Sequence, residues 1–340
     1  MSRKRELDIT KVSSSSDAVS RNFANRIIGQ PEATAALTAV LEKYHSGLYD
    51  RTKPIASLLF LGPTGTGKTA TVETFAEGLF GARDVLLKID CAEYQHSHEI
   101  SRLVGSPPGY LGHRETHPYI TTAKLQSLRT VEHSFTVILL DEIEKASDSL
   151  WNLLLGILDK GTLTLGTNEA VDMCSTIIIM TSNVGSKELA AQAGDASLGF
   201  TSSSIPEIPT ERLKDISVSA AKRKFLPEFL NRLDQIVMFN TLSRGDIAAI
   251  FQLELDRLQA NVIANAKTLV EIIVTPAAKE QIITEGYDRK YGARYLKRTI
   301  EKRVLLPITR SISTKQVEPL DKVIVHYDGK NFVYTALETT

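Results

Sequence analysis

The sequence predicts an α/β protein with a mostly parallel sheet and a phosphate-binding loop, followed by a smaller α+β domain. Three observations lead to this prediction. A glycine-rich loop, residues 62–69, stands between an apolar run and an amphipathic segment. Five short apolar runs alternate with helical patterns, which is typical of strands buried on both faces of a sheet. From about Leu242 the pattern changes to helices followed by two late strand patterns.

The predicted strands of the large sheet are residues 58–61, 85–89, 136–140, 176–180 and 236–239. Strands that alternate with helices are joined by right-handed crossovers, so they lie parallel in one sheet. Ligands of such sheets bind beyond the carboxyl ends of the strands. We therefore expect the glycine-rich loop and the polar residues at the strand ends to meet at one edge.

We divide the chain into residues 1–20, 21–240 and 241–340. The first segment has few apolar residues to bury and is predicted to be a flexible tail. The second is the large domain, which carries the sheet. The third is the smaller domain. Its expected elements are helices near residues 277–285 and 293–312, the latter broken at Pro307, and strands over residues 322–327 and 332–334.

The composition is that of a globular protein without an obligate charged partner. Forty basic residues balance forty acidic ones, which gives no electrostatic argument for nucleic acid or an anionic membrane as a partner. The apolar runs are too short for a membrane span. Two cysteines, Cys91 and Cys174, are too few for a disulfide framework or a cysteine-type zinc site. We expect a cytoplasmic protein.

The glycine-rich loop has the pattern and the flanks of a phosphate-binding loop. It consists of Gly62, Pro63, Thr64, Gly65, Thr66, Gly67, Lys68 and Thr69. Glycines let backbone N–H groups turn inward around anionic oxygens, and the following helix adds its positive end. Lys68 can reach the outer phosphates, and the Thr69 hydroxyl can hold Mg²⁺. The alternative, a turn without a ligand, is disfavoured because both the strand and the helix are present.

Polar residues follow two further strands. The third strand ends in Asp141 and Glu142, so it delivers two carboxylates to the sheet edge. Asp141 suits the coordination sphere of Mg²⁺, and Glu142 suits polarisation of an attacking water. The fourth strand ends at Asn183, whose amide could hydrogen-bond the water or the γ-phosphate. Asn183 is a candidate site residue only because it lies beside the strand that carries the two acids.

Two arginines are candidates for stabilising charge on a transferring phosphoryl group. Arg232 precedes the last strand, and Arg294 begins a helix of the smaller domain. Spacing alone leaves open whether either reaches a nucleotide, because a lone arginine is usually a surface ion pair. His96 and His98 are interpreted as loop residues, because no third metal ligand lies at a suitable spacing.

Over about residues 20–335 the sequence resembles the Clp-type AAA+ ATPases, most closely the C-terminal ATPase module of the ClpA, ClpB and ClpC unfoldases, here as a stand-alone chain. The order and spacing of seven stretches carry the resemblance. They are residues 28–33 (IGQPEA), 62–69 (GPTGTGKT), 105–112 (GSPPGYLG), 140–146 (LDEIEKA), 180–185 (MTSNVG), 227–234 (PEFLNRLD) and 286–294 (GYDRKYGAR).

The resemblance implies a role for each matching residue. Lys68 and Thr69 resemble the Walker A pair, and Asp141 and Glu142 the Walker B pair. Further matches are Asn183 to the sensor on the fourth strand, Arg232 to the arginine finger that reaches a neighbouring subunit, Arg294 to the second sensor, and Ile27 and Ile28 to the segment that packs on adenine. It also implies ATP and Mg²⁺ as cofactors and a homohexameric ring that threads polypeptide.

Two loops bear on what the ring acts on. Tyr110 lies between glycines and resembles the pore loop that grips an extended chain; the alternative is a proline-rich turn with a buried tyrosine. The tripeptide Leu198, Gly199 and Phe200 is similar to the loop by which ClpA, ClpC and ClpX dock on the ClpP peptidase. A local hydrophobic staple explains the tripeptide equally well.

The function that the sequence favours is an ATP-dependent unfoldase or remodelling chaperone, with a ClpP-like peptidase as an open question. The residues that follow the pore tyrosine, 113–118, depart from the family pattern, which leaves substrate preference open. A nucleic-acid motor or loader on the same core is the second hypothesis, although Arg114 is the only basic candidate near the pore loop. A nucleotide-gated scaffold is the third.

Overall fold

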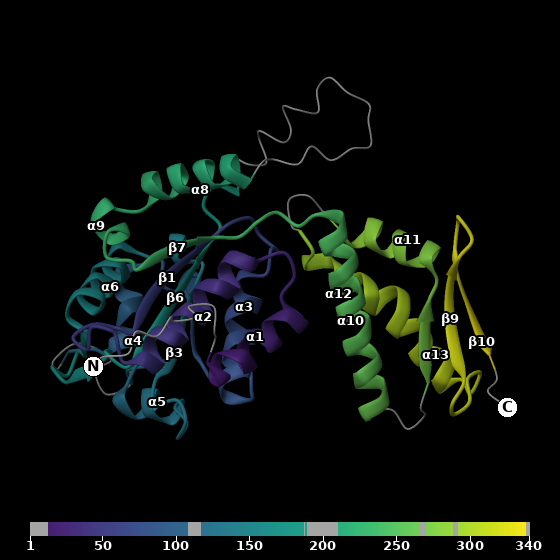
Figure 1. Ribbon diagram of the computed structural model, residues 1–340, viewed down its shortest axis with the longest axis horizontal. Coiled ribbons are helices and arrows are strands. Elements are labelled where there is room, and N and C mark those ends of the chain that lie inside the picture. The colour runs from purple at the N-terminus through teal and green to yellow at the C-terminus, as the bar shows by residue number, and fades with distance from the viewer. Residues whose placement is uncertain are drawn as a thin grey trace, which may run out of the picture. The chain divides into compact units, whose positions relative to one another are not determined.

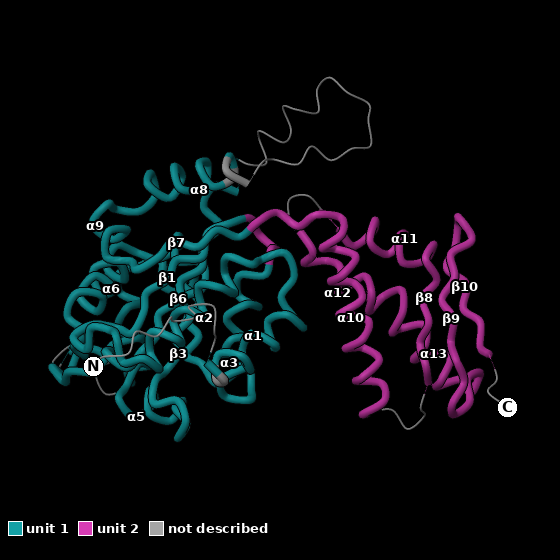
Figure 2. The backbone as a smooth tube through the Cα atoms, in the orientation of Figure 1, with its two compact units in different colours: residues 1–62, 67–189, 205–239 teal, residues 63–66, 190–204, 240–340 magenta. Residues whose placement is uncertain are grey.

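The computed structural model describes residues 13–107, 117–186, 188, 210–265, 270–287 and 292–337. Contacts within the chain divide it into two compact units (Figure 2). The first comprises residues 1–62, 67–189 and 205–239, and the second residues 63–66, 190–204 and 240–340. Among the described residues, no helix combines the length and the apolar character needed to cross a membrane.

The first unit is built on a parallel five-stranded sheet, as predicted (Figure 1). Its strand order is β2-β3-β6-β1-β7. The strands are β1 (Ala56–Leu61), β2 (Leu87–Asp90), β3 (Thr136–Asp141), β6 (Thr176–Ser182) and β7 (Gln235–Met238). Because β1 lies between β6 and β7, and β3 lies between β2 and β6, the carboxyl ends of the central strands meet at one edge of the sheet.

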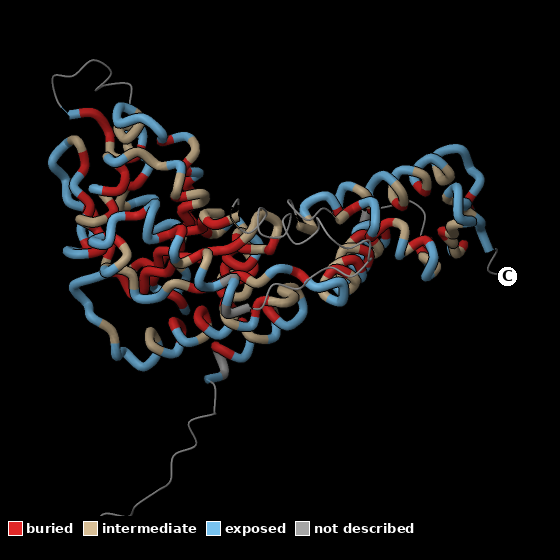
Figure 3. Tube along the Cα trace, turned by 90° about the horizontal axis from the view of Figure 1, so that it is seen from above, coloured by how far each residue is buried: buried red, intermediate tan, exposed pale blue. Residues whose placement is uncertain are grey.

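Helices cover both faces of this sheet, since alternate strand residues enter two different cores. Leu58 and Ile179 pack with α1 (Ser14–Arg26), α2 (Pro31–Ser46) and α3 (Lys68–Phe80). Leu59 and Met180 pack on the other face against α6 (Asp148–Lys160). Buried residues accordingly concentrate in the sheet and in the helix faces that cover it (Figure 3). The near-continuous apolar runs of the strands follow from this burial on two sides.

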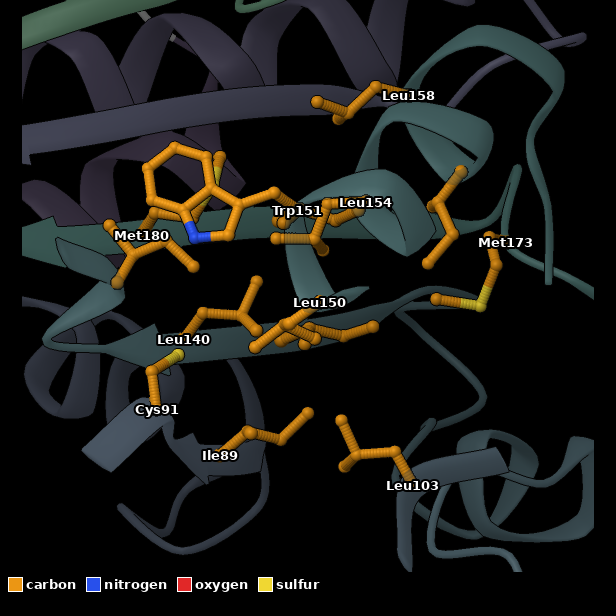
Figure 4. Packing of buried hydrophobic residues seen from close by; sticks show 14 of the residues in the cluster. Ile89, Cys91, Leu103, Leu140, Leu150, Trp151, Leu154, Leu158, Met173 and Met180 are labelled. Carbon is orange, nitrogen blue, oxygen red and sulfur yellow. The ribbon is translucent and has the colours of Figure 1, made fainter. Parts of the chain in front are cut away.

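The core between the sheet and α6 is rich in large side chains. Leu150, Trp151 and Leu154 of α6 point toward Leu140 and Met180 at the ends of β3 and β6 (Figure 4). The indole Nε1 of Trp151 donates to the Ala146 carbonyl oxygen at 3.0 Å, which satisfies its only polar group. This packing fixes the strand ends on which the polar site residues are carried.

The amino-terminal prediction was wrong for residues 14–20. These residues form the first turns of α1, where Ser13 caps the helix by accepting from the backbone N–H of Ser16. Val19 and Phe23 are buried, and Phe23 stacks on Phe75 of α3 with ring centroids 6.1 Å apart. Two apolar side chains one helical turn apart are enough to dock a polar helix, a signal that composition alone does not give.

Further helices and a strand pair complete the described part of the first unit. They are η1 (Cys91–Glu93), η2 (Ser97–Ile100), α4 (Ser101–Val104), α5 (Thr122–Ser127), η3 (Ile143–Lys145), the antiparallel pair β4 (Thr162–Thr164) and β5 (Ala170–Asp172), α8 (Thr210–Lys224) and α9 (Pro227–Leu230). His96 precedes η2, and its backbone N–H donates to the Glu99 carboxylate at 2.8 Å.

The second unit packs helices on a three-stranded sheet of order β10-β9-β8. Its elements are α10 (Arg244–Asn265), β8 (Glu271–Val274), α11 (Pro276–Gly286), α12 (Arg294–Ile300), η4 (Glu301–Leu305), α13 (Leu306–Ser313), β9 (Lys322–Tyr327) and β10 (Phe332–Leu337). The segment η4 is a π-helix just before Pro307. The predicted break at Pro307 is therefore a local widening of the helix, since proline cannot donate the regular hydrogen bond.

Candidate active site

The phosphate-binding loop leaves β1 through a glycine that has no room for a side chain. Gly62 has φ +153°, and a Cβ added there would lie 2.7 Å from the carbonyl oxygen of Phe239. Gly67, with φ +98°, is the N-cap of α3. Both glycines therefore serve the backbone path of the loop, which ends at the amino terminus of a helix, where the backbone N–H groups attract anions.

Lys68 is buried at the centre of the site, 7% exposed. Its Nζ donates to the Gly62 carbonyl oxygen at 2.7 Å and to Oδ1 of Asn183 at 2.8 Å. A buried ammonium needs such acceptors, because removing it from water is otherwise costly. The lysine of the loop and the amide at the end of β6 are thus in direct contact, as the sheet topology predicts.

Thr69 and Asp141 bring the helix and β3 together. The Thr69 hydroxyl lies 3.1 Å from Oδ1 and 3.2 Å from Oδ2 of Asp141. Both residues offer hard oxygen ligands, which is the donor set that Mg²⁺ prefers. Asp141 and Thr69 therefore fit the metal-holding pair that the sequence suggests.

Glu142 has an unusual backbone conformation for a residue with a side chain. Its φ is 56° and its ψ 48°, in the left-handed region, which costs a non-glycine residue on the order of 1–2 kcal/mol. Its carboxylate is ion-paired with Lys145, and its Oε1 accepts from Nδ2 of Asn183 at 3.3 Å. The strained backbone turns the chain sharply after β3 and leaves the Glu142 side chain beside Asn183.

The surroundings of Glu142 include contacts that the sequence did not predict. The hydrogen bond with Glu142 raises the pKa of Lys145, so Lys145 stays a cation facing the carboxylate. Glu144 accepts from the backbone N–H of Asn183 at 3.1 Å, and Thr181 hydrogen-bonds both acids of the β3 end. These contacts lie around the left-handed backbone of Glu142, a conformation that no motif spacing reveals.

Cys91 lies beneath the acidic end of β3. Burial, reinforced by the negative charges of Asp90 and Asp141, raises the pKa of its thiol well above the usual range. The group is therefore a neutral thiol packed in the core and not a nucleophile. Cys174 is also a free thiol, half-buried against the Gly161 carbonyl oxygen.

Arg232 lies apart from these residues, just before β7. Its Nε is 2.5 Å from Oδ1 of Asp159, and its Nη1 is 2.9 Å from the carbonyl oxygen and 3.2 Å from Oε1 of Glu228. The hydrogen bond from Arg232 holds the pKa of the Asp159 carboxyl below its usual value. Within one chain the structure therefore pairs Arg232 with Asp159 and Glu228 and not with the phosphate loop.

The other candidates are placed as follows. Arg294 is exposed at the first residue of α12, and the role of this side chain stays a prediction. Ile27 and Ile28 form the half-buried turn after α1, and Ile27 lines a groove of about 520 Å³ between α1 and α2. Tyr110, and the tripeptide 198–200, lie outside the described residues.

The arrangement unites a buried lysine, a hydroxyl–carboxylate pair, a second carboxylate and an amide at the carboxyl edge of the parallel sheet. These are the parts that a phosphate-loop protein uses to hold a nucleoside triphosphate and orient a water. The site therefore defines the chain as a phosphate-loop nucleotide-binding protein.

Comparison with known proteins gives the family. Residues 53–236 match the AAA domain (Cdc48 subfamily), and residues 242–325 match the C-terminal, D2-small domain, of ClpB protein. The chain belongs to the AAA ATPase family and carries a small domain of the ClpB type. The resemblance inferred from the seven sequence stretches is confirmed.

Relatives are chaperones and Clp ATPases. Chaperone protein ClpB 1 of Nostoc sp. is 36% identical over 91% of this chain and 33% of its own length. ClpC of Staphylococcus aureus, an ATP-dependent Clp protease ATP-binding subunit, is 39% identical over 93% of this chain and 37% of its own length. The chain thus spans about a third of the length of these relatives.

Solved structures of Hsp104 share the fold. A closed state with ATPγS and FITC-casein has a TM-score of 0.77, and an extended S. cerevisiae complex with casein has a TM-score of 0.80. Each is 29% identical and covers 96% of this chain and 53% of the Hsp104 chain.

Proposed function

We propose that the chain is an ATP-dependent protein unfoldase or remodelling chaperone of the cytoplasm. The observation that carries the proposal is the contact of Lys68 and Glu142 with one amide, that of Asn183. This amide links the group that holds phosphate to the group that activates water. A protein that only bound nucleotide would not need Glu142 in a strained backbone beside it.

Nucleotide and Mg²⁺, when bound, supply the phosphoanhydride and the cation that neutralises its charge. Lys68 and the loop N–H groups bind the outer phosphates, and Thr69 with Asp141 holds the metal. Glu142 accepts a proton from the attacking water, while Asn183 fixes the direction of the Glu142 carboxylate. Arg294 is the proposed second sensor, and Ile27 and Ile28 are the proposed adenine contacts.

Polypeptide is the proposed substrate, and a homohexameric ring is the proposed working form. The Hsp104 structures that share the fold contain casein, which supports an unfolded chain as substrate. In a ring, Arg232 serves the site of a neighbour, and Tyr110 contacts the threaded chain. The ClpC relative is a protease subunit, which supports a ClpP-like peptidase as a further partner through residues 198–200.

Phosphate release measured with unfolded casein, and separately with single-stranded DNA, tests the proposal. Lys68→Ala is expected to lose nucleotide binding, while Glu142→Gln binds ATP without turnover. Stimulation by casein and not by DNA supports the unfoldase. Stimulation by DNA alone would instead indicate a nucleic-acid motor. Nucleotide binding without turnover in the wild-type chain would indicate a nucleotide-gated scaffold.

The Glu142→Gln chain also serves as a trap for partners. A pull-down in ATP with a ClpP-like peptidase, repeated after deletion of residues 198–200, tests the docking loop. Equal recovery of peptidase with and without the deletion would show that residues 198–200 do not dock the peptidase.

A further inference from the structure

Thr181 lies at the end of β6, where that strand runs beside the acidic end of β3. The register pairs Leu140 with Met180, so the next residues along the two strands are Asp141 and Thr181. Thr181 is 2% exposed and pairs on its other side with Phe60 of β1. Its side chain is therefore almost completely withdrawn from bulk water.

The hydroxyl connects the two Walker B acids. It hydrogen-bonds Oδ1 of Asp141, and it lies 3.1 Å from the backbone nitrogen of Glu142. A carboxylate only accepts and a backbone N–H only donates, so the directions are fixed. Glu142 donates to the Thr181 oxygen, and the Thr181 hydrogen goes to Asp141. One hydroxyl thus makes both hydrogen bonds with no donor left over.

We propose that Thr181 is a positioning residue for ATP hydrolysis, holding Asp141 in place and fixing the left-handed backbone of Glu142. The inference rests on the proposed ATPase function. Glu142 takes an unfavourable conformation, with φ 56°, and such conformations persist only where neighbours hold them. The bond from its N–H to Thr181 is a contact on the strained residue itself. Without it, the backbone can relax and turn the Glu142 carboxylate away from Asn183.

A second hydroxyl on the same strand provides a matched control. Thr176 is fully buried at the start of β6, and its hydroxyl donates to the Met173 carbonyl oxygen at 2.6 Å. Thr176 begins β6, whereas Asp141 of β3 lies beside the other end of β6. Replacing either threonine by valine removes one buried hydroxyl from β6, but only Thr181→Val disturbs the acids.

The test uses the full chain and compares Thr181→Val, Thr181→Ser and Thr176→Val. Phosphate release over an ATP titration separates kcat from KM, a fluorescent ATP analogue reports affinity, and thermal unfolding reports stability. We expect Thr181→Val to lose about 100-fold in kcat, the size of effect that follows from misplacing a catalytic group. Affinity for the analogue should persist, and Thr181→Ser should regain most of the rate because the hydroxyl is kept.

The outcomes separate this inference from the proposed function. Thr176→Val should match Thr181→Val in lost stability and match the wild type in kcat. Equal kcat for the two valine variants would overturn the positioning role while leaving the ATPase intact. A wild-type chain that binds nucleotide but never releases phosphate would overturn both. If Thr181→Val does not fold, Thr181→Ala provides the same comparison, since it places no methyl group against Asp141.

Discussion

Arg232 and Asp159 form an ion pair within one chain, with Nε of the guanidinium 2.5 Å from the carboxylate oxygen. If Arg232 acts on a neighbour's nucleotide, this pair must open when the ring forms. We therefore expect Asp159→Asn to raise ATP turnover at low protein concentration. The gain should be at most about fivefold, because exposed ion pairs are weak. Arg232→Ala should abolish turnover while leaving nucleotide binding intact.

Turnover measured against protein concentration checks this expectation. Glu228→Gln is the control, since it removes the other carboxylate, 3.2 Å from the same guanidinium, and leaves the Asp159 pair in place. The pKa of Asp159 is held below its ordinary value of 3.8, mainly by the hydrogen bond from Arg232. The pair is therefore present above pH 3.8 and is lost as the pH falls through the lowered value. A pH-dependent change in turnover near neutrality would have to come from another group.

Lys145 is expected to control the orientation of Glu142. Lys145→Met removes the cation that pairs with the Glu142 carboxylate, so we expect kcat to fall roughly tenfold through misplacement of the carboxylate. The side chain of Lys145 is 46% exposed, so the melting temperature should hardly change. Lys145→Arg keeps the charge and is the control. A Lys145→Met chain with wild-type kcat would show that Lys145 does not orient Glu142.

Gly62 should not tolerate a side chain. A Cβ would meet the carbonyl oxygen of Phe239 at 2.7 Å and its Cβ at 2.8 Å. We expect Gly62→Ala to lower the free energy of unfolding by roughly 1–3 kcal/mol, as overpacking does, and to weaken nucleotide binding by moving the carbonyl that holds Lys68. Denaturant unfolding and a nucleotide titration measure the two effects.

Gly156 is the matched control for that substitution. It lies within α6, and a Cβ there would meet nothing within 4 Å. Gly156→Ala should therefore stabilise the chain, by about 0.5–1 kcal/mol, because alanine is the better helix former. If Gly156→Ala destabilises the chain as much as Gly62→Ala does, the clash with Phe239 is not the cause of the lost stability in Gly62→Ala.

His133 should make stability depend on pH. It is 8% exposed, and its Nδ1 has no hydrogen-bond partner among the described residues. Burial, and then the charge of His45, lower the pKa of His133 below 6.5, while Glu132 opposes the shift. The unfolded chain therefore binds the proton first, and stability falls as the pH drops below 6.5.

Melting temperatures at pH 7.5 and 5.5 test this dependence. We expect His133→Phe, which keeps a ring beside Phe80 and Phe135, to reduce the difference between the two values. His98→Asn, at an exposed position, should leave that difference unchanged. An unaltered pH dependence in His133→Phe would assign it to other groups.

The parts of the site that the sequence predicted are those that the sheet itself positions. Lys68 and Asn183 follow parallel strands, whose carboxyl ends were expected to meet at one edge, but the strand order that makes the two strands neighbours and the contact itself come from the structure. The contacts of Thr181 and Lys145 were missed because they surround the left-handed backbone of Glu142, which the sequence does not reveal. That conformation is set by packing around one residue and has no periodic pattern.

Other differences have similarly local causes. The polar start of α1 was predicted to be a tail, because the sequence does not show that Val19 and Phe23 pack on α3. The role of Arg232 toward a neighbouring subunit's nucleotide stays a prediction, and its partner within the chain, Asp159 of α6, was not predicted. A pairing between a half-buried arginine and an exposed carboxylate far away in sequence carries no signal in composition or spacing. The roles of Tyr110 and residues 198–200 stay predictions.

The strand order has a consequence for how the first unit is made. The strand β1 is flanked by β6 and β7, both of which come much later in the chain. The Asp234 carboxylate, just before β7, also accepts a hydrogen bond from the Ser57 backbone N–H, with Oδ2 2.7 Å from the nitrogen. The phosphate loop therefore cannot take its final form until the chain through β7 has emerged from the ribosome. Such distant pairings slow folding, so β1 stays without its two neighbouring strands until late in synthesis.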